Sequence, residues 1–497
     1  MDTYSIVPLL TVLVSLAATV LIVFAGQRPN VRELWTILAS VAKFALVLSM
    51  VPMVLDGRYP AVTLLAISPG ISIALRADPM GMIFALSASV LWIFTSFFSI
   101  GYMRGLEEHK QTRYFACFAI CLSATMGIAF AANLLTFIIF YEILTIATYP
   151  LVIHKETPEA ISAGRKYLAY LLSGGLALVL AIALTLGIAD SVDFVPGGFL
   201  AGQEAAGNGR LLLLFFLFMI GVGVKSAVIP LHSWLPTAMI APTPVSGLLH
   251  AVAVVKAGVF GFVRAIGFVF GPQLLHDIGA SYILAGFASA TILLASLLAM
   301  WQDNLKLRLA YSTVAHLSYI VLGAALLAPS AWTGGLLHIV NHAAMKITLF
   351  FCAGAIYVRT HCENVSQLDG IGRQMPFTMA AFALASMGLA GMPPVGGFIS
   401  KWFLLQGTLA PGGHHAFLIV LLLSGLLNAG YLFPIVVRAF FRHSDNFPRF
   451  GEASPLLVVP LVLTAGLSIS LCLWPDGIFH FYGLASRVAV AVLGGGG

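Results

Sequence analysis

Several ionisable side chains lie inside long apolar runs of this sequence, where a charge would have little water to stabilise it. Glu142 stands in LLTFIIFYEILTIATYP, and Lys225 stands in FFLFMIGVGVKSAVIP. A charge at the centre of a bilayer costs about 3 kcal/mol or more unless it is paired or hydrated, and such residues commonly mark ion pathways and proton relays. The candidate proton-carrying residues are Glu142, Lys225, His250, Lys256, His316, His338, His342, Lys346 and Lys401.

Three of these residues share one helix face. His338, His342 and Lys346 are spaced four residues apart in LLHIVNHAAMKITLFF, so an α-helix stacks them along one side. Because histidine changes its charge near neutral pH, such a row suits the transfer of protons through a hydrated path. A single buried lysine could instead extend its amine to a membrane surface. A series that contains both an acid and bases argues against that alternative.

The motifs indicate no metal, cofactor or catalytic centre. Two histidines four residues apart can bind zinc, but HIVNH lacks the glutamate of the HExxH motif. The cysteines are odd in number and four of the five lie in apolar runs, so they indicate neither a disulfide framework nor a metal site. The glycine-rich pieces lack the phosphate-loop and dinucleotide fingerprints. We therefore expect helix-packing cysteines and chemistry limited to proton transfer.

The composition places these residues in a membrane protein. Hydrophobic residues make up 60% of the 497-residue chain and charged residues only 9%, whereas a soluble domain carries about 25% charge. Apolar runs of the length that spans a bilayer follow one another from 4–25 to 455–475. They predict an all-α, polytopic membrane protein with about 14 transmembrane helices. Asp2 favours a retained first helix over a signal peptide, and 479–497 is expected to form an interfacial or frayed tail.

Loop charges predict how the helices are oriented. Loops after the odd-numbered runs are basic, as in 154–166, whereas loops after the even-numbered runs are neutral or mixed, as in 189–210. The positive-inside rule places the basic loops in the cytoplasm and both chain ends outside. The net charge of +6 therefore reflects orientation, and no nucleic-acid partner is expected.

Two apolar runs are too long for one straight helix and are interrupted by proline. Pro230 lies in the first run, and Pro393 and Pro394 lie in the second. Proline removes a helix hydrogen bond, and broken backbone at membrane depth is tolerated where protein or a watery cavity satisfies it. Breaks at corresponding places in two halves predict an internal inverted repeat, with two ordinary proline kinks as the alternative. The predicted domains are N-terminal helices (1–110), a first half-channel (111–270), a second half-channel (271–445), and a C-terminal helix and tail (446–497).

The stretches that carry these residues resemble a known family. YEILTIATYPLV surrounds Glu142, KSAVIPLHSWLPTAMIAPTPVSGLLHAVAVVKAGVFGFVR carries Lys225 and Lys256, and GMPPVGGFISKWF carries Lys401. With DNLKLRLAYSTVAHLSYI and HIVNHAAMKITLF they cover most of 115–440. They resemble the antiporter-like proton-translocating subunits of respiratory complex I, membrane-bound hydrogenases and Mrp sodium/proton antiporters. The resemblance implies two inverted five-helix repeats, a gating ion pair of Glu142 and Lys225, a central axis of Lys256 and the His/Lys series, and Lys401 as the terminal proton carrier.

The overall length and TPEAISAGRKYLAY are most similar to the D subunit of an Mrp-type cation/proton antiporter. A hydrogenase or complex I–type subunit is the main alternative, and only there would the chain be part of a translocase enzyme. A structural membrane scaffold with an inactive channel is a third possibility. The resemblance implies a multi-pass protein of the bacterial inner membrane whose partners are other membrane subunits, the lipid bilayer and protons. Whether sodium also passes through this chain stays open.

Overall fold

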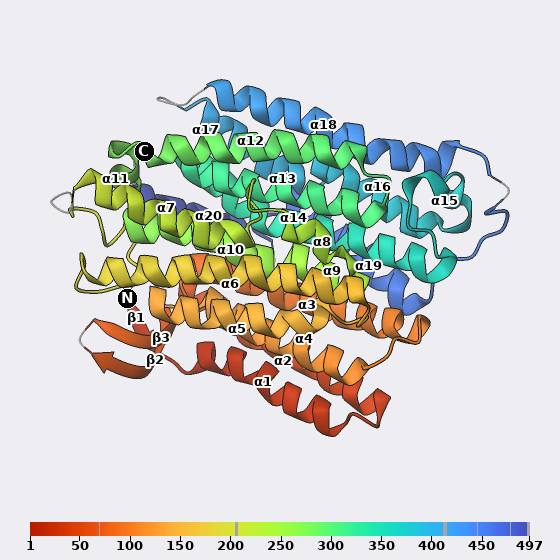
Figure 1. Cartoon of the computed structure of the whole chain (residues 1–497), viewed down its shortest axis with the longest axis horizontal. Helices are drawn as coiled ribbons and strands as arrows, with labels where there is room; N and C mark the ends of the chain where they lie inside the picture. Colours follow the sequence, from red (N-terminus) through yellow and green to blue (C-terminus); the bar gives the residue numbers. More distant parts are fainter. Residues whose placement is uncertain (69, 204–206, 411–414, 445, 478, 495–497) are drawn as a thin grey trace.

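Long helices run side by side across the whole molecule (Figure 1). The computed structural model describes residues 1–497 except 69, 204–206, 411–414, 445, 478 and 495–497, and it describes no side chain at 249–250. The elements in chain order are β1 (Asp2–Tyr4), α1 (Val7–Phe24), α2 (Pro29–Leu55), β2 (Tyr59–Ser68), β3 (Ile71–Arg76), α3 (Pro79–Gly105), α4 (Gln111–Ala129), α5 (Leu134–Val152), α6 (Pro158–Leu186), α7 (Asn208–Lys225), α8 (Trp234–Thr237), η2 (Ala238–Ile240), α9 (Thr243–Gly247), η3 (Leu248–Val252), α10 (Val254–Arg264), η4 (Ala265–Phe270), α11 (Pro272–Asp277), α12 (Ala280–Trp301), α13 (Leu305–Ala325), α14 (Pro329–Thr360), η5 (Val365–Gln367), α15 (Ile371–Gln374), α16 (Pro376–Ala390), α17 (Gly397–Thr408), α18 (His415–Phe441), α19 (Pro455–Leu473) and α20 (Phe481–Leu493).

The helices are long and apolar enough for a membrane protein of many spans. Within the described ranges, 11 of them meet the length and composition needed to cross a bilayer. Three further apolar passes, made by α9–α10, α13 and α16–α17, bring the total to about 14. The expected tail is instead an ordered helix, α20, whose buried residues face α3 and α14. The protein is therefore a polytopic, mainly helical membrane protein.

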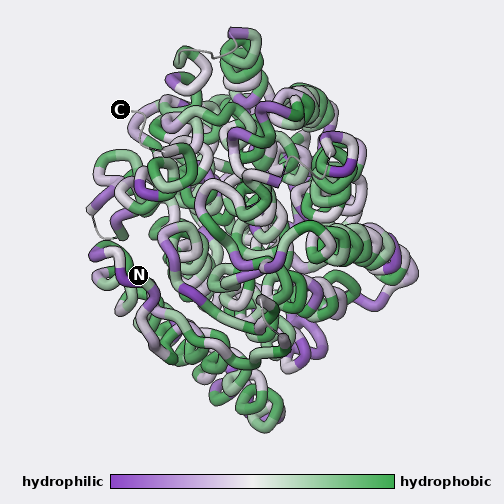
Figure 2. Tube along the Cα trace, turned by 90° about the vertical axis from the view of Figure 1, so that its left-hand side faces the viewer, coloured by the Kyte–Doolittle hydropathy of each residue, from purple (hydrophilic) through white to green (hydrophobic). Residues whose placement is uncertain are grey.

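The two chain ends lie at the same end of the bundle (Figure 1). The loops that follow α1, α3, α5, α12, α14 and α18 lie at the opposite end, and the basic residues of the loop regions lie in or beside them. Seen from the end with the termini, the outer helices are largely hydrophobic and hydrophilic residues gather in the loops (Figure 2). Successive loops therefore lie at alternate ends of the bundle, as the pattern of loop charges predicts. The assignment of the basic end to the cytoplasm stays a prediction.

A small β-sheet, which the helical pattern did not predict, lies beside the N-terminus (Figure 1). Strand β1 pairs in parallel with β2, and β2 pairs antiparallel with β3. Strands β2 and β3 fall in 56–78, between two apolar runs of spanning length, and β1 lies at the start of the chain. Two irregularities in the β2–β3 register mark the sheet as a short, curved ribbon at the end of the bundle.

The proline-containing runs are interrupted where the prolines lie. Helix α7 ends at Lys225, and α8 begins at Trp234, beyond Pro230. Helix α16 ends at Ala390, and α17 begins at Gly397, beyond Pro393 and Pro394. The two broken helices enter the bundle from opposite ends (Figure 1). This is the arrangement expected of an inverted pair, although the division into half-channels at 111–270 and 271–445 stays a prediction.

Helix α14 forms the centre of the bundle. Every residue in the stretch 331–356 is buried, and the helix packs against α3, α13, α16, α17, α19 and α20. A helix that is covered on all sides and still carries polar residues must satisfy them from its neighbours, because no water reaches it from outside. The polar residues of α14 are therefore the natural starting point for the functional site.

A buried ion pair ties the N-terminal helices to the rest of the bundle. Arg264, at the end of α10, donates to both carboxylate oxygens of Asp78 at 2.5 and 2.8 Å. Asp78 also caps α3 by accepting a hydrogen bond from the main-chain N–H of Gly81 at 2.7 Å. The Asp78 and Arg264 side chains are only 6% and 2% exposed. Removing one partner would leave an uncompensated buried charge.

We expect Asp78→Asn to destabilise the protein by about 3–5 kcal/mol, the usual cost of breaking a buried ion pair. Asparagine is as good a helix cap as aspartate, so the variant removes the charge and keeps the cap. The measurement is the thermal midpoint of the purified protein in detergent. The exposed pair Asp56–Arg58, whose side chains are 62% and 56% exposed, is the matched control. Asp56→Asn should change stability by about 1 kcal/mol or less, and equal effects of both variants would contradict this role.

Candidate functional site

Glu142 lies on α5 and Lys225 lies on α7, and the two side chains do not form a direct ion pair. Lys225, at the last turn of α7, donates to the main-chain carbonyl of Tyr141, and its amine lies 3.3 Å from the centre of the Tyr141 ring. Within the described part of the chain, neither carboxylate oxygen of Glu142 has a hydrogen-bond partner. The pair implied by the family resemblance is therefore separated in this structure, with the neighbouring Tyr141 holding the lysine.

The Glu142 carboxylate is packed against the glycine face of α6. A methyl group at Gly175 would come within 2.3 Å of a Glu142 carboxylate oxygen, so only glycine leaves room for the carboxylate here. Glu142 is half-buried, yet both of its oxygens are shielded from solvent. A buried carboxylate without partners requires a nearby positive charge, a bound water or a proton. The nearby Lys225 can supply the positive charge without touching the Glu142 carboxylate.

Lys256 on α10 contacts a histidine of the central helix. Its amine lies 2.9 Å from Nδ1 of His342 on α14, and both side chains are buried. Helix α10 comes close to the end of α7, because a methyl group at Gly258 would lie only 2.4 Å from the main-chain nitrogen of Ser226. The described contacts do not join Lys225 to Lys256. His250 belongs to the segment before α10, but its side chain lies outside the described residues.

Three histidines and a serine continue the series. The ring centres of His342 and His316 are 5.4 Å apart. Nδ1 of His316 lies 3.1 Å from Nε2 of His338, and Nδ1 of His338 lies 2.8 Å from the hydroxyl oxygen of Ser400. Ser400 directly precedes Lys401 on α17. Residues from α10, α13, α14 and α17 therefore form one buried polar series from Lys256 to Ser400.

Two lysines of the second half use main-chain carbonyls as partners. Lys346 donates to the carbonyl of Leu309 on α13 at 3.1 Å. Lys401 donates to the carbonyl of Leu389, near the end of α16, at 2.6 Å. The break in the helix provides room for Lys401, since Gly391 has a φ of +91° and its Cβ position lies 2.8 Å from the lysine stem. Lys346 lies one turn beyond His342, on the same face of α14.

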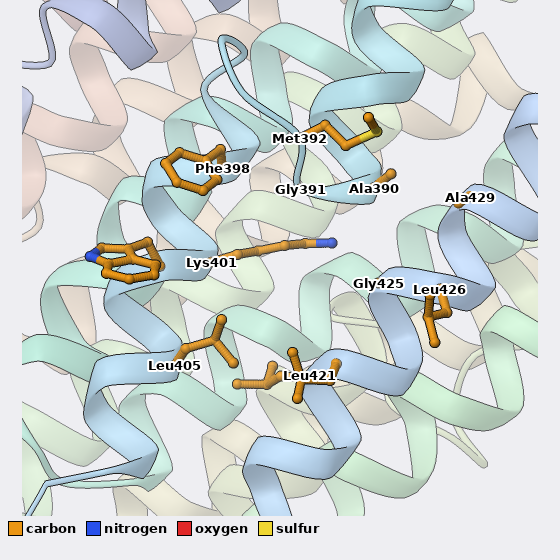
Figure 3. Close-up of a pocket in the computed structure, with 12 residues that line it drawn as sticks. Ala390, Gly391, Met392, Phe398, Lys401, Leu405, Leu421, Gly425, Leu426 and Ala429 are labelled. Atoms are coloured by element: carbon orange, nitrogen blue, oxygen red, sulfur yellow. The ribbon is translucent and has the colours of Figure 1, made fainter.

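Lys401 also lines a cavity that opens at the side of the bundle. The cavity has a volume of about 420 Å³ and lies between α16, α17 and α18. Lys401 extends from α17 towards Gly391 and Ala390 at the end of α16 (Figure 3). Trp402 and Leu426, which also line the cavity, are 50% and 72% exposed. The terminal lysine of the series is therefore close to the outer surface, whereas the histidines are enclosed.

The arrangement can pass protons between neighbouring groups. A neutral amine, an imidazole and a hydroxyl each both donate and accept hydrogen bonds. Within the series from Lys256 to Ser400, a proton can move from one group to the next over hydrogen-bond distances, apart from the step between the His342 and His316 rings. A serine beside a histidine also occurs in hydrolases, but Ser400 is fully buried in the core, where a substrate does not reach it. The geometry suits transfer of protons through the bundle and not covalent chemistry.

The sequence did not predict every member of this site. Ser400 connects His338 to the lysine-bearing turn, and Tyr141 holds Lys225, but serine and tyrosine are ordinary residues in apolar helices. Lys43 was also missed. It is buried in α2, donates to the carbonyl of Leu122 at 2.8 Å, and lies 4.8 Å from the ring of Trp92. The criterion of a charge inside an apolar run, applied to α2, would have found it.

Known proteins share both the sequence and the fold. The family model described as NADH:quinone oxidoreductase/Mrp antiporter, TM, matches residues 131–427. NADH-quinone oxidoreductase subunit N of Desulforudis audaxviator is 32% identical over 371 residues, which cover 72% of this chain and 70% of that protein. A probable K(+)/H(+) antiporter subunit of Rhizobium meliloti is 33% identical over 334 residues, covering 67% of this chain but 32% of the relative. The chain thus spans only about a third of that relative.

Two solved structures have the same overall fold. A chain of the Mrp complex from Dietzia sp. superposes with a TM-score of 0.86 at 21% identity and covers 98% of this chain and 99% of its own length. A chain of the membrane-bound sulfane sulfur reductase, an archaeal respiratory membrane complex, also gives a TM-score of 0.86 at 21% identity, with 98% of each chain covered. At this identity the superpositions establish the fold alone. The family model matches more than half of the chain, and the chain therefore belongs to the NADH:quinone oxidoreductase/Mrp antiporter transmembrane family of antiporter-like membrane subunits.

Proposed function

We propose that this chain is a proton-translocating subunit that moves protons along the buried series from the Glu142–Lys225 region to Lys401. The observation that carries the proposal is the row of polar groups through the enclosed core, from Lys256 through the histidines to Ser400, which lie at hydrogen-bond distance except between the His342 and His316 rings. Ionisable residues inside a membrane are costly, and a protein retains them where they line an ion path. A structural scaffold has no need of this series.

In the proposed path, the first half loads protons at Glu142 and Lys225, and the second half releases them at Lys401. Lys225 rests on the Tyr141 carbonyl and ring, so it does not depend on the Glu142 carboxylate for its hydrogen bond. The two residues can therefore approach or separate as the protonation of their surroundings changes. A closer approach favours the charged forms of both, and separation favours release of the lysine proton.

We further propose that the chain is the D subunit of an Mrp-type multisubunit cation/proton antiporter in a bacterial inner membrane. Its length and the TPEAISAGRKYLAY stretch support this assignment. The superpositions on the Mrp chain and on the sulfane sulfur reductase chain are equally good, so they do not distinguish this assignment from the alternative. The alternative is a proton-pumping subunit of a membrane-bound hydrogenase or a complex I–type assembly. The likeness to subunit N of an NADH-quinone oxidoreductase favours that alternative about equally.

Both assignments require partner subunits. Large apolar side chains are exposed along the outer faces of α6 and α18, for example Leu176 at 70% and Ile419 at 66%. These faces must meet lipid or other membrane proteins. Purifying the chain from its native membrane and identifying the co-purified subunits separates the two assignments. Small membrane proteins without redox centres are expected for an Mrp complex, whereas an iron–sulfur or quinone module would overturn that assignment.

We expect Glu142→Gln to lower proton transport in reconstituted vesicles by about 100-fold, the size that a positioned proton-transfer group typically contributes. The glutamine keeps the shape of the side chain and removes its charge and its ability to carry a proton. Assembly with partner subunits should be unchanged. The measurement is the quench of a pH-sensitive dye at matched protein content. Near-normal transport would exclude a role for the carboxylate.

A substitution in the neighbouring helix tests the same carboxylate without changing any charge. Gly175→Ala places a methyl group where a Glu142 oxygen now lies, and it should displace the carboxylate and impair transport. Gly286→Ala on α12 is the matched control, because no atom lies within 4 Å of the added carbon there. Equal transport in the two alanine variants would show that the position of the carboxylate does not matter.

The contribution of Lys401 to proton transport should depend on its ability to release a proton. We expect Lys401→Ala to lower transport sharply and Lys401→Glu to keep part of it, because glutamate is also titratable. Lys401→Arg should fail, because arginine is not deprotonated in proteins. If Lys401 only anchors α17 at the membrane surface, arginine should substitute well and glutamate poorly. Vesicle transport of the three variants at matched expression decides between these roles.

A further inference from the structure

A second cluster of titratable residues lies at the basic end of the bundle, away from the proton path. Glu108 and His109 belong to the tight loop between α3 and α4, and His154 follows the end of α5. One ligand atom from each of the three side chains lies within 4.8 Å of the other two. His154 Nε2 is 3.7 Å from a Glu108 carboxylate oxygen, and His109 Nδ1 is 4.0 Å from the same oxygen.

His154 is buried without a hydrogen-bond partner. Its side chain is 0% exposed, and within the described part of the chain neither ring nitrogen forms a hydrogen bond. The ring lies against His109, with centres 4.9 Å apart, and against the edge of Tyr114. A buried polar group of this kind calls for a ligand.

The backbone holds the other two residues in place. Glu107 and Lys110, on either side of the Glu108–His109 pair, have φ values of 50° and 47°. These left-handed conformations are uncommon for residues other than glycine. Together they fold the loop so that the pair projects towards His154. His109 is 44% exposed at its side chain, which gives the cluster access to solvent on one side.

The surrounding charges do not exclude a cation. Lys110 and Arg113 lie close by, but both donate to the carboxylate of Glu156, at 2.6 and 2.5 Å. Two carboxylates, Glu108 and Glu156, therefore balance the two cations before any metal binds.

We propose that Glu108, His109 and His154 bind a divalent transition-metal ion, for which zinc is the best candidate. Two imidazoles and one carboxylate form a known ligand set for Zn²⁺, and a water would complete the tetrahedron. With bonds of about 2.0–2.1 Å, the ligand atoms of a tetrahedral site lie about 3.4 Å apart. The present separations from the Glu108 oxygen are 3.7 and 4.0 Å, and all three ligand atoms lie within 4.8 Å of one another, so metal binding draws the side chains together by up to about 1.4 Å.

The bound ion would join two loops that are otherwise linked mainly by the ion pairs of Glu156. It would fix the C-terminal end of α5 to the loop between α3 and α4. Helix α5 also carries Glu142, so a metal ion bound at the basic end of the bundle would restrict the movement of the helix that holds this residue. Metal binding itself does not rest on the proposed transport function.

The experiment measures zinc binding directly. The full-length protein, purified in detergent with any histidine tag removed and stripped with a chelator, is titrated with Zn²⁺ against a chromophoric competitor. We expect one zinc per chain and no competition from excess Mg²⁺, which prefers oxygen ligands. His109→Ala, an exposed position that should not disturb folding, should weaken binding by at least about 10-fold. His154→Ala and Glu108→Gln should act in the same direction.

His276→Ala is the matched control, because this exposed histidine beside Asp277 belongs to α11, which lies at the opposite end of the molecule (Figure 1). It should leave zinc affinity unchanged. X-ray absorption at the zinc edge should show two imidazole ligands in the wild type and one in His109→Ala. Absence of zinc binding by the wild type, or equal affinity in the wild type and His109→Ala, would overturn the proposal.

Discussion

Every charge enclosed in this bundle must find its partner inside the protein, because neither lipid nor bulk water supplies one. Four of the buried lysines solve this in a common way. Lys43, Lys225, Lys346 and Lys401 each donate to a main-chain carbonyl. A carbonyl oxygen has two lone pairs, so a helical carbonyl can accept a second hydrogen bond without losing the first. The same contact serves an ammonium group and a neutral amine, and loss of a proton leaves no unpaired anion behind.

This choice of partner distinguishes the lysines from Arg264. The Arg264 guanidinium is held by two charge-assisted bonds to Asp78, and such a pair fixes both charges permanently. A lysine held by a carboxylate at that distance would be similarly fixed. The structure therefore uses a buried carboxylate where two segments must stay together, and carbonyls or imidazoles where a proton must be free to leave. Glu142 belongs to neither group, because its carboxylate has no hydrogen-bond partner among the described residues.

The sequence predicted much of this arrangement because the constraint acts on residue type. Lys225, Lys256, His338 and Lys401 stand out against apolar neighbours whatever the tertiary fold, and the prolines mark the helix breaks in the same way. The sequence could not predict which groups touch. The separation of Glu142 from Lys225 depends on how α5, α6 and α7 pack. The approach of His154 to the α3–α4 loop likewise depends on how the helices pack. The strands of the small sheet are too short to be found by a search for apolar runs of spanning length.

The interruption in the series has a physical role in any coupled transport. A row of groups that are always in contact would let protons run down their gradient without doing work. Coupling therefore needs one step that opens and closes. The described contacts are continuous from His316 to Ser400, leave the His342 and His316 ring centres 5.4 Å apart, and do not join Lys225 to Lys256. That gap lies next to the break after α7, where the backbone is free of the helical hydrogen bonds that hold a straight helix rigid. Among the described contacts, the step from Lys225 to Lys256 therefore lies beside a broken helix, where a small backbone movement changes connectivity most.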